Sequence, residues 1–150
     1  MSAEDRERAG GRPAPESRSV LVVEDNRPNR ILMHALLTGL GCACELASSG
    51  LEALEMAERR SFDLILMDIH MPHMDGVETL RRLRRGGGPN AATPVVALTA
   101  DAAEQDHAAF RDAGAASVLV KPISPSRLAA AINGCVRPRQ DAEKPGPAAA

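Results

Sequence analysis

Residues 64–68 of this 150-residue chain read LILMD, four consecutive apolar side chains that end at a carboxylate. Residues 20–25 read VLVVED and follow the same design, because Glu24 and Asp25 come directly after the apolar run. Continuous rather than alternating hydrophobicity is typical of a strand buried on both faces, as in a parallel sheet. Such sheets place their ligand sites beyond the carboxyl ends of the strands. The sequence therefore predicts that Glu24, Asp25 and Asp68 meet at one edge of a parallel sheet.

Carboxylates gathered in this way repel one another. Two like charges about 4 Å apart interact by about 4 kcal/mol at an effective dielectric constant near 20. A cation is therefore needed among the three side chains. The pattern indicates a divalent metal site built around one reactive aspartate.

The rest of the chain alternates strands with amphipathic helices and contains no internal repeat. We expect further strands over about 42–47, 94–98 and 117–120, and helices over about 28–40, 102–113 and 125–135, with others after 50 and 76. In the first helix, the spacing predicts an inner face of Ile31, Leu32, Ala35 and Leu36. Five such units predict an α/β fold: a flavodoxin-like, doubly wound five-stranded parallel sheet of order 2-1-3-4-5, with helices on both faces.

The two ends of the chain differ from its middle. Residues 1–18 and 137–150 combine charges with Pro and Gly and carry few apolar side chains, so we expect disordered tails around one domain at 19–136. No DNA-binding, catalytic or kinase segment is recognisable after that domain. We therefore expect it to act alone.

Composition limits the choice of partners and compartment. A net charge of −2 argues against a nucleic-acid partner, which requires a strongly basic face. No apolar run approaches the roughly 20 residues needed to cross a bilayer, and the charged N-terminus is unlike a secretory signal. The cysteines lack zinc-site spacing and are interpreted as reduced thiols. We expect a cytoplasmic protein without membrane insertion.

Three further groups follow later predicted strands: Thr99 and Ala100 after the fourth, and Lys121 after the fifth. The segments VLVVEDNRPNR (20–30), DLILMDIHMPHMDG (63–76), TPVVALTA (93–100) and GAASVLVKPI (114–123) resemble the receiver domain of bacterial two-component response regulators. The resemblance runs from about Ser19 to Gly134. It is strongest to receivers attached to hybrid sensor kinases.

The resemblance implies that Asp68 is the phosphoacceptor and takes a phosphoryl group from a partner's phosphohistidine. It also implies that Asp25 and Asp68 bind Mg²⁺ directly and that Glu24 binds it through water. The backbone carbonyl of His70 would supply another ligand. A partly hydrated shell of oxygen ligands is what Mg²⁺ requires.

The same resemblance assigns the phosphoryl oxygens to Lys121, to the Thr99 hydroxyl and to the Ala100 amide. Phosphoryl transfer is catalysed mainly by positioning and by groups that neutralise these oxygens. The implied partners are a histidine kinase or a histidine phosphotransfer protein, together with an unknown downstream protein. The chain would be a signalling phosphoacceptor that assists its own phosphorylation and dephosphorylation, not an enzyme in the ordinary sense. His70 and Asp101 border the site, where they should influence the lifetime of the acyl phosphate.

One position departs from the family pattern. Most receivers carry Tyr or Phe three residues before the lysine, where this chain has Val118. A valine has one preferred rotamer and little reach, so the usual ring movement has no counterpart here. This keeps open a pseudo-receiver that acts as an adaptor without phosphorylation. A flavin carrier and an aspartate-based phosphatase of the same topology are more remote alternatives.

Overall fold

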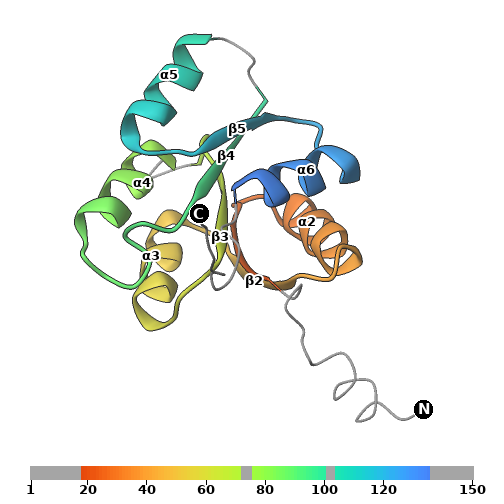
Figure 1. Cartoon of the computed structure of the whole chain (residues 1–150), viewed down its shortest axis with the longest axis horizontal. Coiled ribbons are helices and arrows are strands. Elements are labelled where there is room, and N and C mark those ends of the chain that lie inside the picture. Colours follow the sequence, from red (N-terminus) through yellow and green to blue (C-terminus); the bar gives the residue numbers. More distant parts are fainter. Residues whose placement is uncertain (1–17, 72–75, 101–103, 136–150) are drawn as a thin grey trace, which may run out of the picture.

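The computed structural model describes residues 18–71, 76–100 and 104–135, and both predicted tails lie largely outside these ranges. The strands are β1 (Ser19–Val23), β2 (Ala43–Ala47), β3 (Leu64–Asp68), β4 (Val95–Thr99) and β5 (Ser117–Val120). The helices are α2 (Arg27–Gly39), α3 (Gly50–Arg59), α4 (Gly76–Arg85), α5 (Glu104–Ala113) and α6 (Pro125–Cys135). All neighbouring strands are parallel, in the order β2-β1-β3-β4-β5, which confirms the predicted fold class (Figure 1).

Helices cover both faces of the sheet, so its central strands are buried on both sides. Alternate residues of β1 face opposite layers, because successive side chains of a strand point in opposite directions. Val20 and Val22 pack in the layer of α2 and α6, whereas Leu21 and Val23 pack in the layer of α3 and α4. This double coverage explains the continuous apolar runs of the sequence. The three cysteines, interpreted above as reduced thiols, are free and half-buried: Cys42, Cys44 and Cys135.

The buried face of α2 differs from the one predicted. Met33 and Leu37 face the sheet, whereas Ile31 and Leu32 are 57% and 52% exposed. The helix is apolar on more than one side, so spacing alone does not define its inner face. The helix begins after Asn26, whose side chain caps it by accepting a hydrogen bond from the backbone N–H of Asn29 at 3.0 Å. The prediction was therefore wrong for Ile31, Leu32 and Ala35, whereas Leu36 is half-buried and packs against the core as predicted.

The start of α3 contains a reciprocal cap. The Ser49 hydroxyl accepts a hydrogen bond from the backbone N–H of Glu52 at 3.1 Å. The Glu52 carboxylate accepts bonds from the backbone N–H and the hydroxyl of Ser48, at 2.7 and 2.9 Å. These two bonds lower the pKa of Glu52 below its usual value. The cap therefore contributes most when Glu52 is ionised.

Replacing Ser49 with alanine should lower the free energy of unfolding by about 1 kcal/mol, because an N–H of the first turn loses its partner. The contribution of Glu52 to the cap should weaken in acid, because its pKa is lower in the folded state than in the unfolded state. That contribution is complete above the unfolded-state pKa and is lost as pH falls through the folded-state pKa. Urea unfolding at neutral and acidic pH measures both effects. Ser61→Ala, at an exposed serine, is the control and should leave the stability unchanged.

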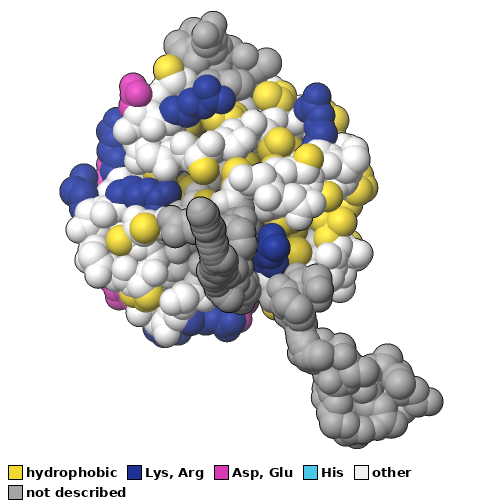
Figure 2. All heavy atoms as spheres, viewed as in Figure 1, with side chains coloured by type: hydrophobic (Ala, Val, Ile, Leu, Met, Phe, Trp, Pro, Cys, Tyr) yellow, Lys and Arg dark blue, Asp and Glu magenta, His cyan; other side chains and the backbone are white. Residues whose placement is uncertain are grey.

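In the part of the chain that the structure describes, no helix is both long and apolar enough to cross a membrane. On the face shown in Figure 2, Lys and Arg side chains are spread out rather than gathered into one basic patch. Apolar side chains are more frequent on the side where α2 and α6 lie.

Candidate functional site

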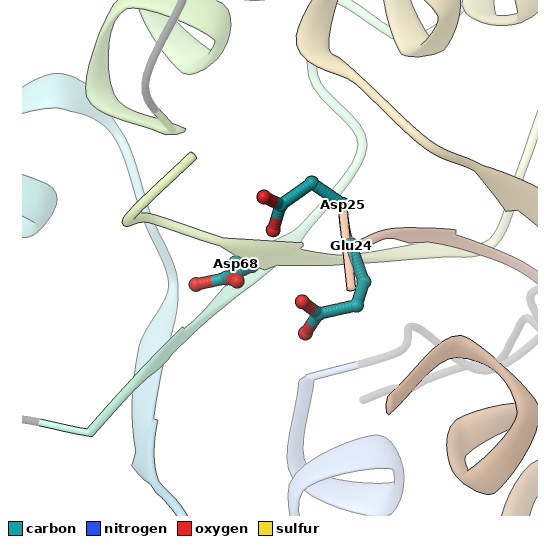
Figure 3. A group of neighbouring side chains, drawn as sticks. All are labelled: Glu24, Asp25 and Asp68. Atoms are coloured by element: carbon teal, nitrogen blue, oxygen red, sulfur yellow. The ribbon is translucent and has the colours of Figure 1, made fainter. Parts of the chain in front are cut away.

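The carboxyl ends of β1 and β3 lie side by side at the centre of the sheet. Val23 of β1 is paired with Met67 of β3, and the acidic residues come one step later on each strand. Glu24 and Asp25 therefore leave β1 beside Asp68, the last residue of β3. The predicted convergence of the three carboxylates is confirmed (Figure 3).

The carboxylate cluster of Glu24, Asp25 and Asp68 is tight. One carboxylate oxygen of each residue lies within 4.8 Å of the others. Glu24 and Asp68 are buried, with 1% and 4% of their surfaces exposed, whereas Asp25 opens to solvent. Among the residues that the structure describes, this is the one such group of three or more potential metal ligands. The site thus combines two buried negative charges with an exposed third.

Lys121 provides the positive charge at the cluster. Its Nζ lies 3.1 Å from Glu24 Oε1 and 3.4 Å from Asp68 Oδ2. The side chain reaches this place because β5 is hydrogen-bonded to β4, and the Lys121 N–H continues that pairing by donating to the Thr99 carbonyl at 2.7 Å. One ammonium group faces three carboxylates, so the cluster keeps an excess of negative charge.

The pKa of Glu24 is raised in this site. Burial raises it above its usual value, and the neighbouring Asp68 raises it further through a hydrogen bond and through its charge. The Asn26 N–H, which donates to Glu24 Oε2 at 3.2 Å, and the Lys121 charge act in the opposite direction. A bound cation would favour the ionised form of the carboxylates, because it adds a local positive charge.

The donor set fits a hard divalent cation. The cluster offers oxygen ligands only, and Mg²⁺ prefers oxygen at about 2.1 Å, with a few carboxylates and several retained waters. Oxygens within 4.8 Å of one another can share one such ion. Softer metals prefer sulfur or imidazole ligands. Mg²⁺ therefore suits the residues present.

The other predicted site residues lie around Asp68 as the topology requires. Thr99 ends β4, the strand next to β3, and is fully buried, and Ala100 follows it at the surface. The His70 N–H donates to Asp68 Oδ1 at 3.1 Å, while the residue itself is exposed. Asp101, predicted to border the site, lies outside the described residues. The roles assigned to these residues stay predictions.

Gly76, at the start of α4, touches the backbone that carries Asp68. Its N–H donates to the Ile69 carbonyl at 3.1 Å. A Cβ atom built on Gly76 would lie 2.6 Å from Ile69 Cα and 2.8 Å from the Asp68 carbonyl oxygen. Only glycine therefore fits this contact. The sequence predicted a helix after residue 76 but not the close approach of two backbone segments.

Sequence reasoning also missed what holds the loop of Glu24 and Asp25. Arg30, on the second turn of α2, donates from Nη1 to the Glu24 carbonyl at 2.8 Å and to the Asp25 carbonyl at 3.0 Å. Arg30 is the last residue of the segment 20–30 quoted above. Its contacts could not be predicted from that segment, because hydrogen bonds to backbone carbonyls leave no pattern in the sequence.

A hollow of about 350 Å³ opens beside Glu24 and Lys121. Its walls are mostly apolar and include Leu32 and Met33 of α2 and Ile123, which follows β5. The exposed Ile31 neighbours Leu32 on the same helix. The site is therefore bordered on one side by accessible apolar surface.

Val118 lies half-buried in β5, against a small cluster formed by Ile69, Ala97 and Phe110. Phe110 of α5 is 4% exposed and supplies the only aromatic ring of that cluster. The ring comes from a helix here, not from β5. Ile69 directly follows Asp68 and shares this cluster with Phe110 of α5. The cluster therefore connects the site to α5 by packing contacts, without a large side chain at position 118.

The chain is similar to proteins of known families. The sequence model of the response regulator receiver domain matches residues 20–133. The chain is 42% identical over 113 residues to the autoinducer 2 sensor kinase/phosphatase LuxQ of Vibrio parahaemolyticus, and the match covers 75% of this chain and 13% of that protein. It is 39% identical over 116 residues to the hybrid signal transduction histidine kinase G of Dictyostelium discoideum, which covers 76% of this chain and 3% of that protein. The chain thus spans a small part of these relatives.

Solved structures show the same likeness. The chemotaxis protein CheY4 of Vibrio cholerae is 30% identical, with a TM-score of 0.76 over 80% of this chain and 99% of that one. The receiver domain of the sensor histidine kinase PA1611 from Pseudomonas aeruginosa PAO1 is 33% identical, with a TM-score of 0.73 over 79% of this chain and 97% of that one. A magnesium ion is coordinated in the active site cleft of that receiver domain.

Proposed function

The chain belongs to the response regulator receiver domain family, and from this premise we propose that Asp68 accepts a phosphoryl group from a phosphohistidine partner in a Mg²⁺-dependent reaction. The observation that carries the proposal is the meeting of Asp68 with Glu24, Asp25 and Lys121 at the ends of three strands. The phosphorylated domain, proposed to span residues 19–136, then relays a two-component signal by protein–protein contact. A cytoplasmic location suits this role.

The proposed metal site uses the carboxylate cluster. Asp25 and Asp68 would hold Mg²⁺ directly, Glu24 through water, and the His70 carbonyl would complete the protein ligands. When bound, Mg²⁺ supplies positive charge to the phosphoryl oxygens. The exposed Asp25 lies on the open side of the cluster, where a hydrated ion can enter.

The proposed transfer forms one bond and breaks one. An Asp68 carboxylate oxygen attacks phosphorus, the P–N bond of the phosphohistidine breaks, and the imidazole leaves with the electron pair. Lys121, already 3.4 Å from Asp68, pairs with one phosphoryl oxygen. The Thr99 hydroxyl and the Ala100 N–H donate to the others. Such preorganised donors are the main source of rate in phosphoryl transfer.

The proposed donor is a histidine kinase or a histidine phosphotransfer protein. Its imidazole must come within bonding distance of Asp68, so it must cover the rim of the site. The apolar hollow, which the exposed Leu32 lines, lies beside Glu24 and Lys121 and supports docking of a protein surface there. The downstream partner is a protein of unknown identity, and no basic patch on the face in Figure 2 favours nucleic acid.

The test is a phosphate-affinity gel of the purified chain after incubation with acetyl phosphate or phosphoramidate, with and without Mg²⁺. We expect a shifted band that requires Mg²⁺ and disappears in hydroxylamine, which cleaves acyl phosphates. Mass spectrometry of the borohydride-reduced protein should place the modification on Asp68. No shift with either donor or with several histidine kinases would contradict phosphotransfer and favour the adaptor function.

A further inference from the structure

We propose that Arg30 is a positioning residue of the magnesium site: it holds the backbone of Glu24 and Asp25 so that their carboxylates face Asp68. This inference rests on the proposed metal-dependent function, because it concerns the same cluster. It assigns a task to a side chain that touches neither the metal position nor the phosphoryl position through its own hydrogen bonds.

The geometry ties the segment that follows β1 to helix α2. Nη1 of Arg30 bonds the carbonyls of Glu24 and Asp25, at 2.8 and 3.0 Å, from one turn inside α2. The Arg30 N–H bonds the Asn26 carbonyl at 3.0 Å as part of that helix. The segment between β1 and α2 is thereby fixed at consecutive residues. Any rotation of the Asp25 peptide would break a bond to the guanidinium.

Asp25 is the residue that depends most on this hold. It is exposed, and it follows the last residue that β1 anchors to its neighbour, where the Glu24 N–H donates to the Ala47 carbonyl at 3.0 Å. Glu24, in contrast, is buried and also paired with Lys121. Without Arg30, the direction of the Asp25 side chain would rest on backbone preferences alone. We therefore expect the loss to appear as weaker metal binding.

A positioning role and a purely electrostatic role of Arg30 predict opposite changes in Mg²⁺ affinity when Arg30 is replaced. If Arg30 acted only as a nearby cation, it would repel Mg²⁺, and its removal would tighten binding. If it acts by holding the loop, its removal weakens binding. Both bonds from Arg30 Nη1 go to backbone carbonyls and not to a carboxylate, which is the geometry of a residue that holds the loop.

The experiment is isothermal titration of the full chain with MgCl₂, compared for wild type, Arg30→Gln, Arg30→Lys and the control Arg27→Gln. Arg27 is exposed in the first turn of the same helix, so its replacement removes an equal charge nearby without touching the loop. We expect Arg30→Gln to bind Mg²⁺ about tenfold more weakly, as is usual for groups that orient metal ligands. Arg30→Lys should also bind more weakly, because both carbonyls are bonded by Nη1 at the far end of the guanidinium, and the shorter lysine side chain places its ammonium nearer to the backbone of α2. Arg27→Gln should bind as the wild type does or slightly more tightly.

A kinetic readout separates positioning from general damage. At saturating Mg²⁺ the phosphorylation rate of Arg30→Gln should return to within about twofold of wild type, because the reacting groups are intact. Circular dichroism in EDTA verifies the fold, and Arg30→Lys serves as the test variant if Arg30→Gln is unfolded. Unchanged or tighter binding in the folded Arg30 variants would overturn the proposal. If the wild type does not bind Mg²⁺, or if Asp25→Asn binds it as well as the wild type does, the proposed function itself fails and Arg30 loses its role with it.

Discussion

Replacing Asp68 with asparagine should abolish the Mg²⁺-dependent, hydroxylamine-labile modification completely. Asparagine has the same shape and can keep the contact with the His70 N–H, but its amide is not a nucleophile for phosphorus. The stability should change in two directions. Without metal, the free energy of unfolding should rise, because one of three clustered negative charges is gone. With Mg²⁺, wild type should gain about 2.7 kcal/mol at a concentration of 100 Kd, and the variant should gain much less.

The gel shift and thermal unfolding with EDTA or Mg²⁺ measure these effects on the same samples. Asp112→Asn is the matched control, because Asp112 is an exposed aspartate of α5 outside the carboxylate cluster. It should behave as the wild type does in both assays. Full modification of Asp68→Asn would mean that another residue is the acceptor. A variant that is less stable in EDTA would mean that the pair with Lys121 outweighs the repulsion.

Replacing Gly76 with alanine should damage stability and chemistry together. The added Cβ would meet two backbone atoms, Ile69 Cα at 2.6 Å and the Asp68 carbonyl oxygen at 2.8 Å, and neither is the end of a flexible side chain. Overpacking of this kind costs about 3 kcal/mol when the backbone itself must move. The same movement displaces Asp68, and a misplacement of about 1 Å can slow a reaction about 100-fold. Urea unfolding and the initial rate with phosphoramidate measure the two losses.

Gly39→Ala provides the control for Gly76→Ala. Gly39 is the last residue of α2, and no atom lies within 4 Å of a Cβ built there. Alanine at that position should leave the phosphorylation rate unchanged and stabilise the protein by up to about 1 kcal/mol. If Gly76→Ala resembled Gly39→Ala in both measurements, the close contact between α4 and Asp68 would not be a real constraint.

Strand positions could be predicted from the sequence because burial on both faces leaves unbroken apolar runs. The buried runs before Glu24 and Asp68 are examples, and both lie in the centre of the sheet. The inner face of α2 could not be predicted in this way. Ile31, Leu32 and Met33 are consecutive apolar residues, and nothing in their composition says which one faces the sheet. Packing decides it, because Met33 and Leu37 are the buried residues of this helix that join the core on that side of the sheet.

In the candidate site, the residues that could be predicted from the sequence were those at the ends of strands. Their convergence followed from topology, because the carboxyl ends of parallel strands share one edge. The contacts that support them were not predictable. Arg30 bonds backbone carbonyls, and Gly76 is required by the space between two main chains. Both depend on three-dimensional distances that no spacing of residue types encodes.

The ion pair between Lys121 and Glu24 joins residues 97 positions apart, which has a consequence for synthesis. During synthesis, all three carboxylates emerge from the ribosome long before β5 does. Until then, the nascent chain holds mutually repelling acids without their counterion, and the edge of β4 has no neighbour. A product that stops short of β5 therefore lacks both the counterion of the cluster and the strand that pairs with β4. Because Lys121 follows the final strand, the carboxylate cluster acquires its counterion only after all five strands have been made.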